Sequence, residues 1–217
     1  MLTTAPEPPA LLHPSGEQRV IFHHMTWDTY LQMLALLPQS RNSRLTYDYG
    51  ILEITMPLED HEFYRSLIEY FIRGLVELMD LPLKAMGSTT LNYPHLEKGA
   101  EPDSAYYIQN QPLVKGRNVD FANDPPPDLV VEVDITHTDI QKNQFYAALG
   151  VPEFWRFNGK VWHIYVLRSH AYIEVEQSPT FPDIPKTWLY DFLATAKEDE
   201  IGAMRSLRKR WNAAHPA

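Results

Sequence analysis

The chain of 217 residues contains no cysteine. Disulfide bonds, thiolate nucleophiles and cysteine-ligated zinc or iron-sulfur centres are therefore excluded, and any chemistry must use oxygen and nitrogen groups. No apolar run approaches the roughly 20 residues that cross a bilayer, and the start of the chain lacks the basic-then-apolar order of a signal peptide. These absences lead us to expect a cytoplasmic protein that does not enter the membrane.

Positive charge is scarce as well. The chain has 19 Lys and Arg residues against 28 Asp and Glu residues, a formal net charge of −9. This balance disfavours a protein that holds nucleic acid through a broad basic surface. A local cationic groove or a bound metal ion could still offset the overall charge.

The hydrophobic content of 44% is high enough to build a sizeable core. A chain of this length most simply forms one domain. Residues 1–19 are rich in proline and small polar residues, which predicts a flexible N-terminal arm without regular structure. We therefore expect a single domain over residues 20–217.

Hydrophobic periodicity predicts a mixture of helices and strands. One helix runs from its cap at Thr26 through Leu37, two short strands flank Tyr49-Gly50, and a long helix covers Glu59 to Asp80. Further along we expect a helix from about Asp139 to Leu149 and one or two closing helices after a proline-rich loop over 178–188. Strands are predicted at 83–91, 103–109, 128–135, 153–157, 160–167 and 171–177. The fold class is α/β.

Glu132 lies inside the apolar run LVVEV, where a charged side chain is unusual. In a strand, alternate residues share a face, so one face carries Leu129, Val131, Val133 and Ile135, and the other Asp128, Val130, Glu132 and Asp134. Glu132 and Asp134 are then roughly 6.6 Å apart along the strand and repel each other if both are ionised. A cation is expected nearby.

Lys142 is the candidate for this cation. Thr138 and Gln141 have the spacing of a capping box, which predicts a helix that carries Lys142 in its first turn. At 100° per residue, Lys142 projects into the same sector as Phe145 and Tyr146 and so faces the sheet. The connection between strand and helix is short, so the amine can reach back toward Glu132.

Asp103 stands just before another apolar strand. Two acids from neighbouring strands and a lysine form a hard oxygen site of the kind that suits magnesium, which favours metal-assisted phosphoryl chemistry. The alternative for Asp103 is that its Pro-Asp pair only makes the turn that leads into the strand. For Glu132 and Lys142, the alternative is a structural, charge-balancing pair.

Three segments carry a resemblance to a known family: PDSAYYI, PDLVVEV and DIQKNQFYAALGVPEFW. Together they resemble the Uma-type putative restriction endonucleases, a branch of the PD-(D/E)XK nuclease superfamily, over about Thr26 to Leu193. The resemblance implies a restriction-endonuclease-like mixed β-sheet flanked by helices. It also implies Mg²⁺, for which Mn²⁺ substitutes, hydrolysis of DNA phosphodiester bonds, and a homodimer.

Carried over by position, Asp103 matches the first metal-binding aspartate of the family and Glu132 its second acid. Lys142 matches a lysine that has moved from the strand to the helix, and His61 a histidine common at the start of the long helix. In the mechanism that this implies, the backbone carbonyl of Val133 completes the metal site. Lys142 then orients the attacking water or stabilises charge on phosphorus.

The chain departs from the superfamily at Asp134, where the usual Glu-x-Lys pattern has lysine. This extra carboxylate either adds a metal ligand or weakens the site, and a solvated position at the strand edge is the remaining alternative. His137 in the following segment either contacts phosphate or makes a turn. The acidic balance and Asp134 together keep a second function open, that of a catalytically inactive nuclease fold used for binding or assembly.

Overall fold

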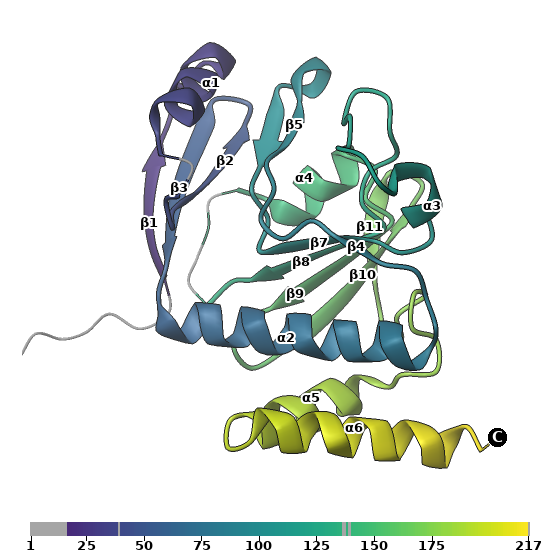
Figure 1. Ribbon diagram of the computed structural model, residues 1–217. Helices are drawn as coiled ribbons and strands as arrows, with labels where there is room; N and C mark the ends of the chain where they lie inside the picture. The colour runs from purple at the N-terminus through teal and green to yellow at the C-terminus, as the bar shows by residue number, and fades with distance from the viewer. Residues whose placement is uncertain (1–16, 39, 136–137, 139, 217) are drawn as a thin grey trace, which may run out of the picture.

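The computed structural model describes residues 17–38, 40–135, 138 and 140–216. In this part of the chain, six α-helices accompany eleven strands, which form two sheets (Figure 1). None of the helices formed by these residues is long and apolar enough to cross a membrane. The α/β class expected from the sequence is confirmed.

The first sheet is antiparallel, with strand order β1-β3-β2-β6-β5. Its strands are β1 (Glu17–Phe22), β2 (Arg44–Asp48), β3 (Ile51–Pro57), β5 (Leu91–Tyr93) and β6 (Lys98–Ala100). Helix α1 (Trp27–Leu36) begins where expected, because the Thr26 hydroxyl accepts a hydrogen bond from the Thr29 amide. Tyr30 of this helix is fully buried and stacks on Tyr47 of β2, which fixes α1 on the sheet.

Strand β1 corrects the predicted boundary of the N-terminal arm. Residues 17–19, which composition assigned to the arm, belong to β1, while residues 1–16 lie outside the described residues. The strand is hard to recognise because its usual polarity is inverted. Glu17 and Arg19 point inward, whereas Val20 and Phe22 are exposed. Glu17 and Arg19 pair with each other, and Arg19 also binds Asp134, which follows β8 of the second sheet, as described below.

The second sheet is mixed, with strand order β11-β10-β9-β8-β7-β4. Its strands are β4 (Lys84–Ala85), β7 (Ser104–Tyr107), β8 (Leu129–Val133), β9 (Glu153–Phe157), β10 (Trp162–Arg168) and β11 (Ala171–Val175). Strands β8 and β9 are parallel and the other neighbours antiparallel. This is the mixed sheet that the family resemblance implied, while the antiparallel sheet beside it was not anticipated as a separate unit.

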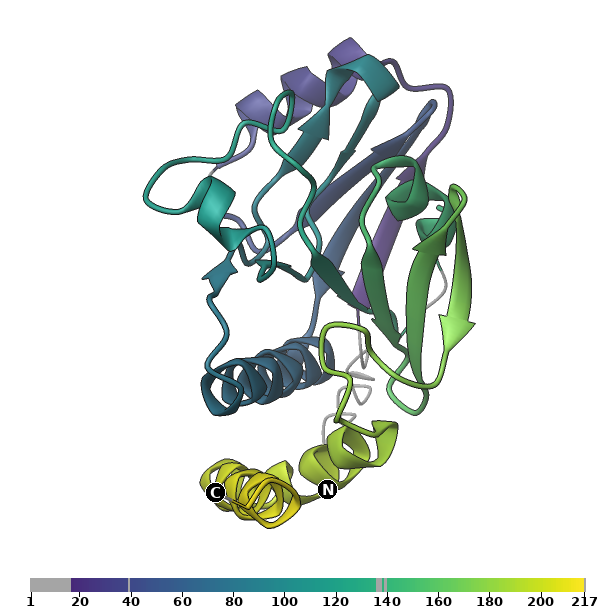
Figure 2. The same ribbon diagram turned by 90° about the vertical axis from the view of Figure 1, so that its right-hand side faces the viewer.

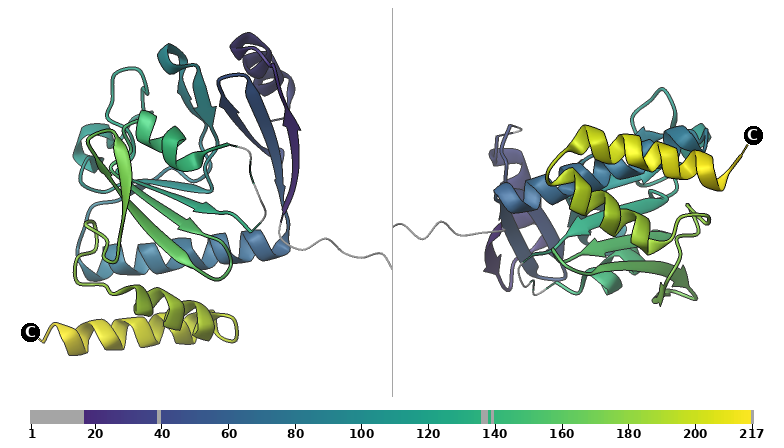
Figure 3. Two further views of the ribbon diagram at one scale, coloured as in Figure 1. Left: turned by 180° about the vertical axis from the view of Figure 1, so that it is seen from behind. Right: turned by 90° about the horizontal axis from the view of Figure 1, so that it is seen from below.

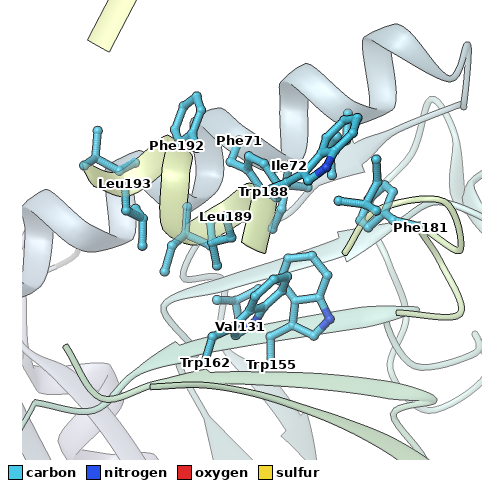
Figure 4. Close-up of a cluster of buried hydrophobic side chains, with 14 of the residues drawn as sticks. Phe71, Ile72, Val131, Trp155, Trp162, Phe181, Trp188, Leu189, Phe192 and Leu193 are labelled. Carbon is cyan, nitrogen blue, oxygen red and sulfur yellow. The ribbon is translucent and has the colours of Figure 1, made fainter. Parts of the chain in front are cut away.

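Helices cover one face of the mixed sheet. Helix α2 (Glu59–Leu78) runs across it, and α5 (Lys186–Ala196) and α6 (Glu200–Ala214) pack outside α2 (Figures 1 and 3). Figure 2 shows the two sheets side by side above the pair formed by α5 and α6. The core between these layers includes Phe71, Trp155 and Leu189, which point toward one another in Figure 4. This layer covers one face of β8.

Helix α4 (Lys142–Ala148) lies on the opposite face of β8. Its Phe145 and Tyr146 pack with Val130, while Leu129, Val131 and Val133 join the core under α2. The alternation predicted for this strand is therefore confirmed. A short helix, α3 (Gln111–Val114), lies in the connection between β7 and β8.

The predicted start of α4 is wrong by about one turn. The helix begins at Lys142, after Gln141, whose side chain makes no capping hydrogen bond. The Thr138 hydroxyl instead donates to Glu53 of β3 and accepts from the Ile140 amide, so the expected capping box does not form. Asp139, which was expected to open the helix, lies outside the described residues.

Candidate active site

The candidate site lies where the chain passes from one sheet to the other. Strand β6 ends at Ala100 in the first sheet, and β7 begins at Ser104 in the second. Asp103 closes this short link. Because Ser104 pairs with Val131 in an antiparallel register, Asp103 lies across from Glu132 on β8.

The sequence-predicted residues line one small cavity of about 10 Å³, which is the space that one water molecule or a small ion needs. Its lining includes Asp103, Glu132, Val133, Lys142 and His61. Asp134 is not among the described residues that line it. The fold thus brings five of the six predicted residues to one place.

Asp103 is held by three donors. Its Oδ2 accepts from the Val133 amide at 2.6 Å and lies 3.1 Å from His61 Nε2, while its Oδ1 accepts from Arg44 at 2.5 Å. Burial alone raises the pKa of a carboxyl group. Here the hydrogen bond and charge of His61, with the charge of Arg44, outweigh burial and hold the pKa of Asp103 well below its usual range.

Glu132 is buried beside Lys142 and Tyr146. Its Oε2 accepts from Lys142 Nζ at 2.8 Å, and its Oε1 accepts from the Tyr146 hydroxyl. Burial is the main cause that raises the pKa of Glu132 to about 7, since Lys142 offsets it only in part and the charges of Asp103 and Asp134 add to it. The two acids opposite each other therefore differ strongly in acidity, because Asp103 has two cations beside it.

Lys142 reaches Glu132, as the helical sector predicted, and it also binds Asp134, which directly follows β8. Its Nζ lies 2.8 Å from Glu132 Oε2 and 2.6 Å from Asp134 Oδ1. Burial would lower the pKa of this amine, but the charges of Asp134 and Glu132 outweigh it and raise the pKa above its usual value. The amine stays protonated at neutral pH.

Asp134 is only 1% exposed at its side chain, so a solvated position is wrong. Besides Lys142, its carboxylate binds Arg156 Nε at 2.8 Å and Arg19 at 3.1 Å. Burial opposes ionisation, but these cations, Lys142 foremost, hold the pKa of Asp134 below its usual value. This extra acid, which directly follows β8, is the centre of a buried ionic cluster.

His61 lies in the first turn of α2 and is 1% exposed. Burial disfavours the charged imidazole, but the hydrogen bonds to Asp103 and Glu62 and the charge of Asp103 together outweigh it and raise the pKa of His61 to about 9. Its Nδ1 lies 3.5 Å from Glu62 Oε1. His61 is therefore a cation that faces Asp103.

Several contacts of the site escaped the sequence analysis. Arg44 opens β2 and binds both Asp103 and Glu62, and Arg19 of β1 binds Asp134 and also Glu17 and Glu53. The inward direction of Tyr146 was predicted, but not its hydrogen bond to Glu132. The signal available for Arg44 was its place on the polar face of a short strand. His137 lies outside the described residues.

The described residues contain no group of three or more His, Asp or Glu side chains placed to hold a metal ion. Magnesium, however, commonly takes one or two carboxylates and keeps several waters. Asp103 and Glu132 supply such a pair on one cavity. The Val133 amide donates to Asp103, and the N–H and C=O of a strand residue point to the same neighbouring strand, so its carbonyl lies on that side too. The donor set fits a small hard cation, with Arg44 as its competitor for Asp103.

The fold is similar to that of a solved structure described as a putative nuclease. A solved structure from Anabaena variabilis ATCC 29413, described as a putative nuclease belonging to DUF820, superposes with a TM-score of 0.52. At 17% sequence identity it covers 76% of this chain, which spans 97% of that one. No curated protein matches the chain. The restriction-endonuclease-like architecture expected from the sequence is confirmed.

A comparison of the sequence with family models identifies the family. Residues 27–191 match the Uma2 family, described as putative restriction endonucleases. This match covers well over half of the chain, and the chain belongs to that family.

Proposed function

We propose that this protein is a metal-dependent endonuclease that hydrolyses phosphodiester bonds in DNA. The observation that carries the proposal is that the side chains of Asp103, Glu132 and Lys142 line one cavity. They come from the residue just before β7, from β8 and from α4. Membership of a family described as putative restriction endonucleases supports the reaction class.

In this proposal Asp103, Glu132 and the backbone carbonyl of Val133 hold Mg²⁺, and Mn²⁺ substitutes for it. The ion, when bound, polarises a phosphate and lowers the pKa of a water molecule. Lys142 is the one ammonium group among the described residues that line the cavity, and it lies beside Glu132. It would orient the attacking water or stabilise charge on the phosphate, and Asp134 fixes the direction of its amine.

The phosphates of DNA would bind to this site through the divalent cation rather than through a broad basic surface. The net charge of −9 makes general attraction to DNA weak, so binding should depend on the divalent cation. Two active sites are needed to cut both strands at once, and we expect a homodimer on that ground. Light scattering of the purified protein tests the dimer.

The test of the proposed activity is nicking of a supercoiled plasmid with Mg²⁺. The wild-type protein should nick the plasmid, and Glu132→Gln should lose most of both Mg²⁺ affinity and activity because a ligand charge is removed. Lys142→Ala should bind Mg²⁺ in calorimetry yet cleave about 10²–10³-fold more slowly. Glu77→Gln, an exposed acid that pairs with Arg208 far from the cavity, is the control and should cleave like the wild type.

A second function remains, because one observation favours it. Each carboxylate oxygen of Asp103 and Glu132 already has a donor from the protein. A chain in which these ion pairs never open would use the nuclease fold only to bind or assemble. Such a protein would bind no Mg²⁺ in calorimetry and would nick no plasmid, and this result would contradict the nuclease proposal.

A further inference from the structure

Arg44 joins the small cavity to a much larger cleft. It is the first residue of β2, and its side chain is 13% exposed. The same side chain lines the inner cavity and an outer cleft of about 830 Å³. Asp103 and Glu101 are also shared by the two. The cleft therefore leads from solvent toward Asp103, and Arg44 lies between the cleft and the small cavity.

The outer cleft combines donors that suit phosphate with three acids that pair with its arginines, Glu62, Glu101 and Asp103. Besides Arg44, its lining includes Arg41 and Arg65 and a set of short polar side chains, namely Asn42, Ser43, Ser88, Thr89 and Thr90. Guanidinium, hydroxyl and amide groups are the donors that proteins most often offer to the sugar-phosphate backbone of nucleic acids. Pro57 is its one large apolar lining residue among those described.

The arginines of the cleft are not equivalent. Arg41 binds Glu101, and Arg65 binds Glu62 and Glu69. Arg44 alone among these three contacts Asp103, through one nitrogen, while its other terminal nitrogen binds Glu62 at 2.8 Å. Arg44 thus binds the candidate metal ligand Asp103 and, at the same time, Glu62 of the outer cleft.

We propose that Arg44 is a phosphate-binding residue of this site, held by Asp103 and Glu62 until a divalent cation takes its place on Asp103. The inference rests on the proposed function. A guanidinium and a divalent cation compete for the same carboxylate, because two positive charges within about 4 Å of each other repel strongly in a partly buried site. Arg44 keeps its contact with Glu62 and turns toward the cleft, where its fork suits a phosphate.

The proposal predicts opposite effects on two affinities. Arg44→Met frees Asp103 of its competitor, so Mg²⁺ alone, titrated by calorimetry without DNA, should bind about 10-fold more tightly. The same change removes a charged contact to DNA. A short labelled DNA duplex, followed by fluorescence anisotropy in the presence of Ca²⁺, should bind about 10-fold more weakly. The slope of log affinity against log salt concentration should become less steep by about 0.9, the value for one phosphate contact.

Arg73→Met is the matched control. Arg73 likewise pairs with an acid, Glu69, but its side chain is half-exposed and lines neither the cavity nor the cleft. This variant should leave both affinities unchanged. Thermal melting shows whether each variant folds. If Arg44→Met does not fold, Arg44→Lys keeps the charge but loses the fork, and it should still weaken DNA binding several-fold.

The outcomes separate this inference from the proposed function. If Mg²⁺ binds wild type and Arg44→Met equally, Arg44 is only a structural partner of Asp103 and the exchange is wrong. If Mg²⁺ binds more tightly but DNA binding does not change in Arg44→Met, or in Arg44→Lys where that variant is used, the phosphate role is wrong. A wild-type protein that binds no Mg²⁺ at all would overturn the nuclease proposal itself, and the inference with it.

Discussion

Asp134 offers the sharpest test of the buried ionic cluster. Its carboxylate contacts Lys142 at 2.6 Å, Arg156 at 2.8 Å and Arg19 at 3.1 Å, and its side chain is 1% exposed. Asp134→Asn keeps the shape of the side chain but removes the charge that these three cations share. Breaking a buried ion pair by removing one partner typically costs about 3–5 kcal/mol, because the remaining charge is buried without compensation.

The geometry places this variant at the lower end of that range. Lys142 keeps Glu132, Arg19 keeps Glu17 and Glu53, and Arg156 is 30% exposed and can turn to water. We therefore expect a loss of about 3 kcal/mol in the free energy of unfolding at neutral pH. For a chain of this size that lowers the urea midpoint by about 1–1.5 M, if unfolding is two-state.

Glu77→Gln is the control for the loss of one negative charge. Glu77 is 67% exposed and pairs with the half-exposed Arg208, so its removal should cost less than about 1 kcal/mol. Urea unfolding followed by tryptophan fluorescence compares the two variants. If Asp134→Asn is no less stable than Glu77→Gln, the cluster does not hold the ends of β1, β8 and α4 together, and the reasoning fails.

Three further predictions concern the surroundings of the site. Because the folded pKa of His61 is raised from 6.5 to about 9, its contribution to stability is complete below pH 6.5 and is lost as pH rises through about 9. At 1.36 kcal/mol per pKa unit this amounts to about 3 kcal/mol, measured as the difference between unfolding free energies on the two sides of that window, and His61→Gln should not show it. Tyr146→Phe removes the hydroxyl that Glu132 accepts from and should cost about 2 kcal/mol in urea unfolding, and an unchanged midpoint would count against that hydrogen bond. Leu189→Ala, at a fully buried position of α5 in the core shared with α2 and the mixed sheet, should cost about 2–5 kcal/mol, whereas Leu36→Ala, at a position 84% exposed, should change stability by less than about 0.5 kcal/mol.

The parts of the site that depend on local geometry could be predicted from the sequence. Alternation along β8 placed Glu132 and Asp134 on the face of α4, and helical spacing turned Lys142 toward them. Both inferences use only the period of a strand or a helix. Tertiary structure did not override them because this strand is buried on both faces.

What could not be predicted depends on contacts distant in sequence. Arg19 and Asp134 are 115 residues apart, and the inverted polarity of β1 makes sense only once Asp134 is seen beside it. Thr138 was expected to cap α4, but Glu53, 85 residues away, binds its hydroxyl instead. Arg44 meets Asp103 because β2 and β6 pair in the first sheet, which no local pattern reveals.

The most direct test of the central claim is a crystal of the protein soaked in Mn²⁺ and measured at the manganese absorption edge. The account predicts an anomalous peak in the small cavity, bonded to the carboxylates of both Asp103 and Glu132, with Lys142 still beside Glu132. An ion bound elsewhere, or a cavity still closed by Arg44 at saturating Mn²⁺, would contradict it.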